Sequence, residues 1–224
     1  MIVESAASNN PIQTELIDGV LIVRVNRREN RSSLCIVTCG DLAQELVRAD
    51  GDPDVKVVLL RGCDDFFTAG SDVVDFVNFP LLSLLPPALS FLDALSHSVK
   101  PVFAAVNGGA ALVGTIMMLR CDLVYTANTV ILQMPFVSLG VCSEAGVAMS
   151  LPTGQQNASE LLLLWEPSTA ARTERPGFVT AVVPYAGLIK SVRSKVPNDL
   201  HLPPPTYLPE SYTESSGVDI QSAA

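Results

Sequence analysis

The segment from Pro101 to Leu119, PVFAAVNGGAALVGTIMML, carries no charged residue. A run of this length and hydrophobicity could cross a membrane as a helix. However, Pro101 and the sequence Asn107-Gly108-Gly109 divide it into two shorter apolar halves, because proline and paired glycines are typical of turns. A buried strand, a glycine turn and a buried helix explain the segment better than a membrane span.

Strands and helices are predicted to alternate along the rest of the chain. Two apolar runs flank Asp18-Gly19 between Thr14 and Val25, which is a strong hairpin signal. Residues Val55–Gly62 are rich in β-branched residues and predict a buried strand. Further strands are expected in Val99–Gly108, Cys121–Ala127, Thr129–Pro135 and Phe178–Pro184, and helices in Leu34–Val47, from Pro86-Pro87 to Leu95, in Ala111–Arg120, Ala158–Glu166 and Leu188–Val196. This order predicts an α/β domain with right-handed crossovers.

The composition limits the classes of function. With 224 residues, 48% of them hydrophobic and 17% charged, the chain can build one sizeable domain with a large buried core or a buried oligomer interface. A formal net charge of −9 argues against nucleic-acid binding, which usually needs a basic stripe. The sequence shows no secretory signal, no Arg-rich transit peptide and no C-terminal Ser-Lys-Leu, so we expect a soluble intracellular protein, in the cytoplasm or an organelle matrix.

Metal, disulfide and histidine-based chemistry lack a recognisable motif. The five cysteines include no CxxC pair and are expected as free, buried thiols in a reducing compartment. Asp64, Asp65 and Asp75 have neither the spacing nor the neighbours of a metal site, so we interpret them as solvated loop charges. His97 and His201 are outside any catalytic motif, and His97 is expected to be structural.

Three glycine-containing turns each follow a predicted strand. They lie in FFTAGSDV (Phe66–Val73), KPVFAAVNGGAALVG (Lys100–Gly114) and MPFVSLGVCSEAG (Met134–Gly146). In α/β sheets such turns gather at the carboxyl ends of the strands, where ligands bind. Each turn alone is more often structural than functional, but together they predict one site.

The succession FxAGxD, KPVxAAVNGxAxxxG, CDxxY and PxxxLG resembles the crotonase superfamily, the enoyl-CoA hydratase and isomerase family, from about Thr14 to Pro184. The resemblance implies a ββα spiral fold with a truncated C-terminal helical region. Residues 1–186 would form the spiral core, and residues 187–224 a short helix with an irregular Pro/Ser-rich tail. It also implies a homotrimer or a dimer of trimers.

The resemblance implies an acyl-CoA thioester as substrate, with coenzyme A as part of that substrate and no separate cofactor, metal, nucleic-acid or membrane partner. Two backbone N–H groups of the family receive the thioester oxygen and stabilise an enolate. The matching residues are Ser71 and Val113. Residues expected to contact CoA or the acyl chain are Ala69, Gly70, Asp72, Gly114 and Phe136, and Asp72 is also expected to fix its loop by hydrogen bonding.

The acidic positions favour an isomerase. Hydratases of the family carry glutamates where this chain has Ile116 and Phe136, so both water-activating carboxylates are missing. Glu144 has the spacing of the catalytic acid in the LGxxPE motif of monofunctional Δ3,Δ2-enoyl-CoA isomerases, although Ser143 replaces the proline. The resemblance therefore implies Glu144 as the base that carries a proton from C2 to C4 of a 3-enoyl-CoA. A solvated loop acid, or one at a helix start, is the alternative for Glu144.

Other departures from the family leave two alternatives open. The family signature NRPxxxNAL is degraded here to NRRENRSSL, Val113 replaces a glycine, and the C-terminal helices that usually cover the acyl site are reduced. One alternative is a catalytically degenerate protein that binds CoA thioesters or serves in an assembly. The other is a different crotonase reaction, such as thioester hydrolysis.

Overall fold

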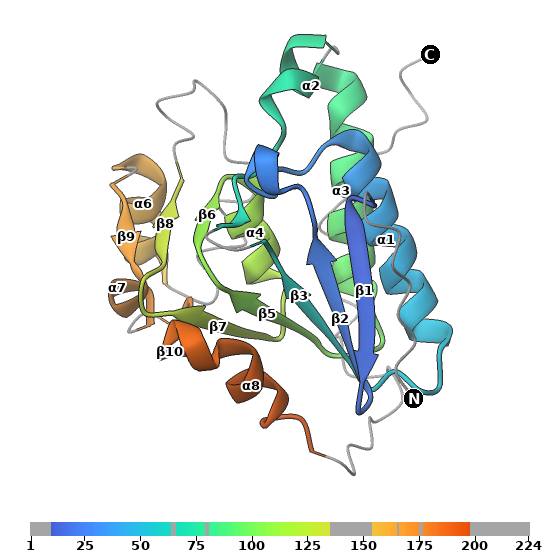
Figure 1. The fold of residues 1–224 in the computed structure, drawn as a ribbon. Coiled ribbons are helices and arrows are strands. Elements are labelled where there is room, and N and C mark those ends of the chain that lie inside the picture. Colours follow the sequence, from blue (N-terminus) through green and yellow to red (C-terminus); the bar gives the residue numbers. More distant parts are fainter. Residues whose placement is uncertain are drawn as a thin grey trace.

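The computed structural model describes residues 10–63, 66–78, 81–134, 154–164, 166–174 and 177–197. Its larger sheet has six strands in the order β1-β2-β3-β5-β7-β10 (Figure 1). The hairpin strands β1 and β2 are antiparallel, and every other neighbouring pair in this sheet is parallel. These strands are β1 (Ile12–Ile17), β2 (Val20–Val25), β3 (Val57–Arg61), β5 (Val102–Val106), β7 (Leu123–Ala127) and β10 (Ala181–Val183).

The predicted hairpin is confirmed. Ile17 pairs with Val20, so Asp18 and Gly19 form a two-residue turn. Both residues have positive φ, 52° for Asp18 and 82° for Gly19. Positive φ at both central positions is what a type I′ turn requires, and Asp-Gly adopts it readily.

A second, four-stranded sheet follows the order β4-β6-β8-β9. Its strands are β4 (Phe66–Thr68), β6 (Gly109–Ala111), β8 (Ile131–Gln133) and β9 (Ser168–Thr169). We expected residues 66–68 and 109–110 only as parts of glycine turns and Ala111 at the start of a helix, and this was wrong, because Phe66 pairs with Gly109 and Thr68 with Ala110, and Ala111 ends β6. Strands of three residues are too short to show an alternating pattern, so only the pairing reveals them.

The two sheets and the helices form repeated ββα units. A strand of the six-stranded sheet leads into a strand of the small sheet and then into a helix: β3, β4 and α2, then β5, β6 and α4, then β7, β8 and α6. The helices are α1 (Ile36–Gly51), α2 (Val73–Asn78), α3 (Leu81–His97), α4 (Val113–Leu119), α6 (Gln155–Leu163), α7 (Ala170–Glu174) and α8 (Leu188–Arg193), with 3-10 turns at Arg28–Asn30 and Tyr185–Gly187. The α/β ββα architecture predicted for the core is confirmed.

Helix α3 differs from the prediction at its start. It begins at Leu81 and includes Pro86 and Pro87, although we expected a shorter helix after these prolines. Proline lacks an N–H, so each one removes a backbone hydrogen bond from a helix interior. The packing of α3 along α1, visible in Figure 1, compensates for these losses. The helix start considered as an alternative for Glu144 lies outside the described residues.

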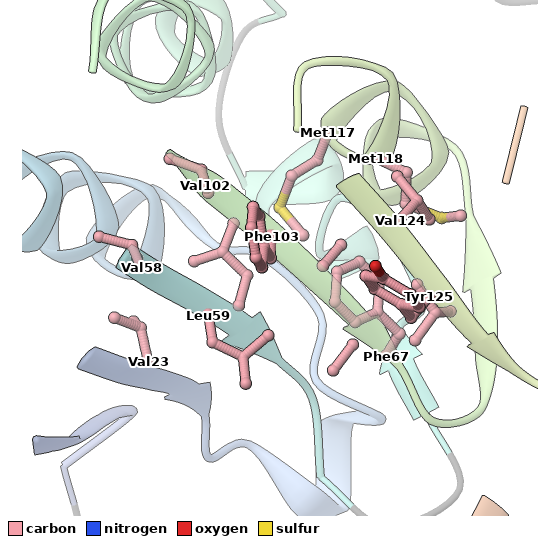
Figure 2. Close-up of a cluster of buried hydrophobic side chains, with 14 of the residues drawn as sticks. Val23, Val58, Leu59, Phe67, Val102, Phe103, Met117, Met118, Val124 and Tyr125 are labelled. Carbon is pink, nitrogen blue, oxygen red and sulfur yellow. The ribbon is translucent and has the colours of Figure 1, made fainter. Parts of the chain in front are cut away.

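The hydrophobic core lies between the large sheet and the helices that cover it (Figure 2). Val58 and Leu59 of β3 are fully buried, and Met117 and Met118 of α4 pack into the same core. The apolar run from Pro101 to Leu119 thus becomes β5, β6 and α4, as predicted except for the extra strand. Within the described part of the chain, no helix combines the length and hydrophobicity needed to cross a membrane.

Candidate active site

Three loops meet beyond the carboxyl ends of neighbouring parallel strands. The first, residues 26–34, follows β2. The second, residues 69–72, follows β3 and β4, and the third, residues 112–114, follows β5 and β6. Because these strands are neighbours in the sheet and run in the same direction, their loops emerge at one edge. The fold therefore brings together two of the three glycine turns, and the third, which contains Glu144, lies outside the described residues.

The first candidate amide belongs to Ser71. Residues Leu34 and Ser71 form an isolated parallel bridge, in which the Leu34 N–H donates to the Gly70 carbonyl at 2.8 Å and the Asp72 N–H donates to the Leu34 carbonyl at 3.0 Å. In a trans peptide the C=O and N–H point in opposite directions. Since the Gly70 carbonyl faces Leu34, the Ser71 N–H faces away from it, and among the described residues it has no hydrogen-bond acceptor.

The second candidate amide belongs to Val113, the first residue of α4. Amides of the first helical turn have no acceptor within their own helix, and the described residues offer none to Val113 from elsewhere. The preceding residue, Leu112, has φ 50° and ψ −122°, a backbone conformation that favours glycine. Both sequence-predicted amides are thus left without a hydrogen-bond acceptor among the residues that the structure describes.

Glycine allows the two loops to touch. A Cβ atom on Gly70, where φ is +88°, would lie 2.7 Å from the Ala111 carbonyl oxygen and 2.9 Å from the Leu112 Cβ. A Cβ atom on Gly114 would lie 2.2 Å from the Thr68 Cγ2. No side chain fits at either position without displacing its neighbours. These close approaches bring the segments that carry Ser71 and Val113 together.

A buried ion pair lies behind the Ser71 loop. Arg27 Nη1 donates to Asp72 Oδ2 at 2.7 Å, the Ser33 hydroxyl donates to the same oxygen at 3.0 Å, and the Val74 amide donates to Asp72 Oδ1 at 3.0 Å. Burial alone would raise the pKa of the Asp72 carboxyl, but these hydrogen bonds and the Arg27 charge outweigh it and hold that pKa below its usual value. Asp72 therefore fixes its loop by hydrogen bonding, as predicted.

The remaining predicted residues have various surroundings. Ala69 is half-buried, and its N–H donates to the Arg31 carbonyl at 3.0 Å. Ile116, also half-buried, lies on α4 one turn after Leu112 and packs against the core. Phe136 and Glu144 lie outside the described residues, as do Asp64 and Asp65. Asp75 is not a free loop charge, because its carboxylate accepts the Ile36 N–H at 2.9 Å at the start of α1.

Thiols and metal-ligating side chains offer no second site in the part of the chain that the structure describes. Cys39 and Cys63 are buried and Cys35 and Cys121 half-buried, all four free. Burial, with smaller effects of the neighbouring Cys35 and Asp75, raises the pKa of the Cys39 thiol to about 12, which makes it a poor nucleophile. The described residues contain no cluster of three His, Cys, Asp or Glu side chains suited to a metal ion.

Arg27 is the site residue that sequence reasoning missed. It follows Asn26 in NRRENRSSL, where it matches the arginine of the family signature, yet the changes around it made the whole segment look degraded. Its partner Asp72 is distant in the sequence, so spacing gives no indication of their contact. Only the retained arginine and the acid of FxAGxD, taken together, could have suggested the pair.

The chain is similar to several known proteins. It is 31% identical to the 2,3-dehydroadipyl-CoA hydratase of Escherichia coli over 171 residues, which covers 74% of this chain and 66% of that protein. It is 28% identical to the mitochondrial enoyl-CoA hydratase of Pongo abelii over 172 residues, which covers 75% of this chain. The match spans only 59% of the length of the Pongo abelii protein.

The fold also has close structural counterparts. The enoyl-CoA hydratase/isomerase of Pseudoalteromonas atlantica superposes with a TM-score of 0.80 and 32% identity, covering 86% of this chain and 78% of that one. The family model described as enoyl-CoA hydratase/isomerase matches residues 15–203, which include the three loops of the site. The chain therefore belongs to the enoyl-CoA hydratase/isomerase family, the crotonase superfamily.

Proposed function

We propose that this protein is an acyl-CoA isomerase that moves the double bond of a 3-enoyl-CoA to the 2-position through a thioester enolate. The observation that supports the proposal best is a pair of amides, Ser71 and Val113, on loops that meet beside the carboxyl ends of β3 and β5; neither amide has an acceptor within the described segments. In the proposed mechanism these two N–H groups donate to the thioester oxygen.

Such amides would supply the electrostatic part of catalysis. When a base removes a proton from C2, negative charge moves onto the thioester oxygen. Hydrogen-bond donors already fixed around that oxygen stabilise the enolate without having to reorganise, and losing one such donor typically costs about 3 kcal/mol of transition-state stabilisation. The glycines at positions 70 and 114 support this role, because they let the two backbones approach each other.

The choice of isomerisation over hydration rests on Ile116 and Phe136. Ile116 lies on α4 close in sequence to Val113, at the position where the hydratases carry a glutamate, and its side chain is aliphatic. Phe136 replaces the second hydratase glutamate. Neither side chain can accept a proton from water, so addition of water across the double bond lacks its general base. The proposed reaction thus differs from the hydration named for the hydratase relatives.

Glu144 is the proposed proton carrier. Isomerisation requires removal of a proton from C2 and return of a proton to C4, and one carboxylate over that face of the acyl chain can do both. A base is most effective when its pKa is near the working pH, and the apolar sequence around Glu144 is of the kind that raises the pKa of a carboxyl group. The substrate is an acyl-CoA, and the assembly we propose is a homotrimer or a dimer of trimers.

The test is a Glu144→Gln variant assayed on a 3-enoyl-CoA, with products separated by mass-resolved chromatography. We expect turnover to fall by about 10²- to 10⁴-fold with the fold intact. Glu160→Gln is the matched control, because Glu160 is an exposed acid of α6 that pairs with Arg172. Undiminished turnover in the Glu144→Gln variant would contradict the assignment, and so would release of 3-hydroxyacyl-CoA by the wild type from a 2-enoyl-CoA.

A further inference from the structure

The carboxylate of Asp72 is occupied by the protein itself. Asp72 is 6% exposed, and both of its oxygens accept hydrogen bonds, Oδ2 from Arg27 and Ser33 and Oδ1 from the Val74 amide. A carboxylate held in this way has little capacity left for a ligand. Its effect on the chemistry must therefore pass through the residue beside it, Ser71.

Two peptide units adjoining Ser71 are fixed from the same side. The Gly70 carbonyl accepts the Leu34 N–H, and the Asp72 N–H donates to the Leu34 carbonyl. The Asp72 side chain adds a third attachment, to Arg27 and Ser33 in the same 26–34 loop. Rotation of the Gly70–Ser71 peptide would break the bond from the Leu34 N–H to the Gly70 carbonyl, and the bonds of Asp72 to the same loop keep that loop in place. The direction of the Ser71 N–H therefore depends on this set of bonds.

One nitrogen atom of Arg27 joins the hydrogen bonds of Ser33 and Asp72. Arg27 Nη1 lies 2.8 Å from the Ser33 carbonyl oxygen, 2.9 Å from the Ser33 hydroxyl and 2.7 Å from Asp72 Oδ2, and these three acceptors share its two hydrogens. The side chains of Arg27 and Asp72 are 20% and 7% exposed, so water screens their attraction only weakly. Removal of the cation would leave a buried carboxylate without its charge partner, and the loop would shift to let water reach it.

We infer that Arg27 is a positioning residue: through Asp72 and Ser33 it holds the Gly70–Ser71 peptide so that the Ser71 N–H faces the thioester oxygen. This inference rests on the proposed function, because it assigns the Ser71 amide to an acyl-CoA. Positioning of this kind affects the rate more than the binding of substrate. A misplacement of about 1 Å at a reacting group can cost about 10²-fold in rate.

The experiment compares Arg27→Met, Arg27→Lys and Asp72→Asn with the wild type, using cinnamoyl-CoA as the probe. The thioester carbonyl of this molecule is conjugated, so its absorption moves to the red when hydrogen bonds polarise the carbonyl. Cinnamoyl-CoA also has no C4 proton to lose, so the shift can be read without isomerisation. In parallel, kcat and KM are measured on a 3-enoyl-CoA, and the dissociation constant of cinnamoyl-CoA is obtained by titration.

We expect Arg27→Met and Asp72→Asn to lose most of the red shift and to lower kcat about tenfold or more, while KM and the dissociation constant change less than about threefold. Arg27→Lys should restore most of the shift, because the three acceptors surround one nitrogen and an ammonium group has a hydrogen for each of them. Asp75→Ala is the matched control, since it removes the carboxylate that accepts the Ile36 N–H but leaves the hydrogen bonds of the Asp72 side chain in place.

The outcomes separate this inference from the proposed function. A wild type that shifts the spectrum but does not isomerise overturns the proposed reaction and leaves the positioning role to be decided by the variants. If folded Arg27→Met and Asp72→Asn keep the full red shift of cinnamoyl-CoA, the positioning role is overturned. It is also overturned if Asp75→Ala loses the red shift to the same extent as these variants. A wild type that binds cinnamoyl-CoA without any shift overturns both.

Discussion

Strands β2, β3 and β5 and the three loops of the site that follow them are held in place by different forces. The interiors of the strands are apolar, as in Val57, Val58 and Leu59, which are all fully buried. The loops instead bury polar residues and contain most of the positive φ angles outside the hairpin. The buried polar residues of these loops and their neighbours are Ser32, Ser33, Thr68, Asp72, Asn107 and Thr115, and the positive φ angles belong to Arg31, Ser32, Gly70 and Leu112.

This difference separates the strands, which stabilise the fold, from the loops, which orient the functional groups. Apolar burial has no preferred direction and tolerates any conformation that excludes water. Hydrogen bonds between buried polar groups require particular distances and angles, and a buried polar group without a partner is costly. The strands therefore supply most of the free energy of folding, and the loops fix the directions of individual N–H groups such as that of Ser71.

The largest predicted effect concerns the strands. A Leu59→Ala substitution in β3 removes a fully buried side chain, so we expect a loss of about 3 kcal/mol in the free energy of unfolding. Because no titratable group is involved, the loss should be the same at pH 5, 7 and 8. Urea titration at these three values checks it, and a loss that varies with pH would show that the strands also depend on charge.

An intermediate effect is predicted for the loops. Asp72→Asn retains the shape of the side chain but weakens the hydrogen bonds from Arg27 and Ser33, which should cost about 2 kcal/mol of stability at pH 7. The pKa of Asp72 is lower in the folded protein than its usual value, near 3.9 for an unfolded chain. The wild type therefore has this stabilisation above that value and loses it as the pH falls through the lower, folded pKa.

The measurement is urea unfolding of the wild type and Asp72→Asn from pH 7 down to pH 2.5. The difference in the free energy of unfolding between these two proteins should narrow below about pH 4, whereas the difference between the wild type and Leu59→Ala should not. A constant gap for Asp72→Asn would mean that the ion pair contributes nothing to stability and that the loops resemble the strands.

The same difference explains what the sequence could predict. Hydrophobic periodicity and turn residues indicate the hairpin, β3, β5 and α4, because apolar burial acts over whole segments and leaves a pattern. The short strands β4 and β6 leave none, since they form only by pairing with neighbouring strands, β4 with β6 and β6 with both β4 and β8. Helix α3 was expected too short because its packing on α1 outweighs the local cost of Pro86 and Pro87.

For the site, local sequence placed Gly70 and Gly114 in turns beside a ligand, and the structure adds the contacts that need them to be glycines. The pairing of Arg27 with Asp72 could not be derived, because it depends on two loops from different strands meeting in space. Leu112 was also unnoticed. A leucine in a helix-forming stretch gives no sign of a positive φ, which is imposed by its place between β6 and α4.

The smallest predicted effect concerns the backbone at Leu112, and it should reverse a general rule. In most positions glycine is less stable than alanine by about 0.5–1 kcal/mol, because it loses more conformational freedom on folding. At φ 50° and ψ −122° any side chain costs about 1–3 kcal/mol of strain, which glycine avoids. Both variants remove the same half-buried leucine side chain beyond Cβ, so we expect Leu112→Gly to be more stable than Leu112→Ala by about 1 kcal/mol.

Val47 supplies the matched comparison. It is an exposed residue of α1 with ordinary helical surroundings, so Val47→Gly should be less stable than Val47→Ala by about 1 kcal/mol. Thermal unfolding of the four variants gives both differences. If glycine is the less stable substitution at both positions, the backbone at Leu112 is not strained. The Val113 amide is then held by the Gly70 and Gly114 contacts alone. Opposite signs at the two positions would show that the loop at Leu112 holds backbone strain that the strands and helices do not. This strain lies directly beside the proposed catalytic amide of Val113.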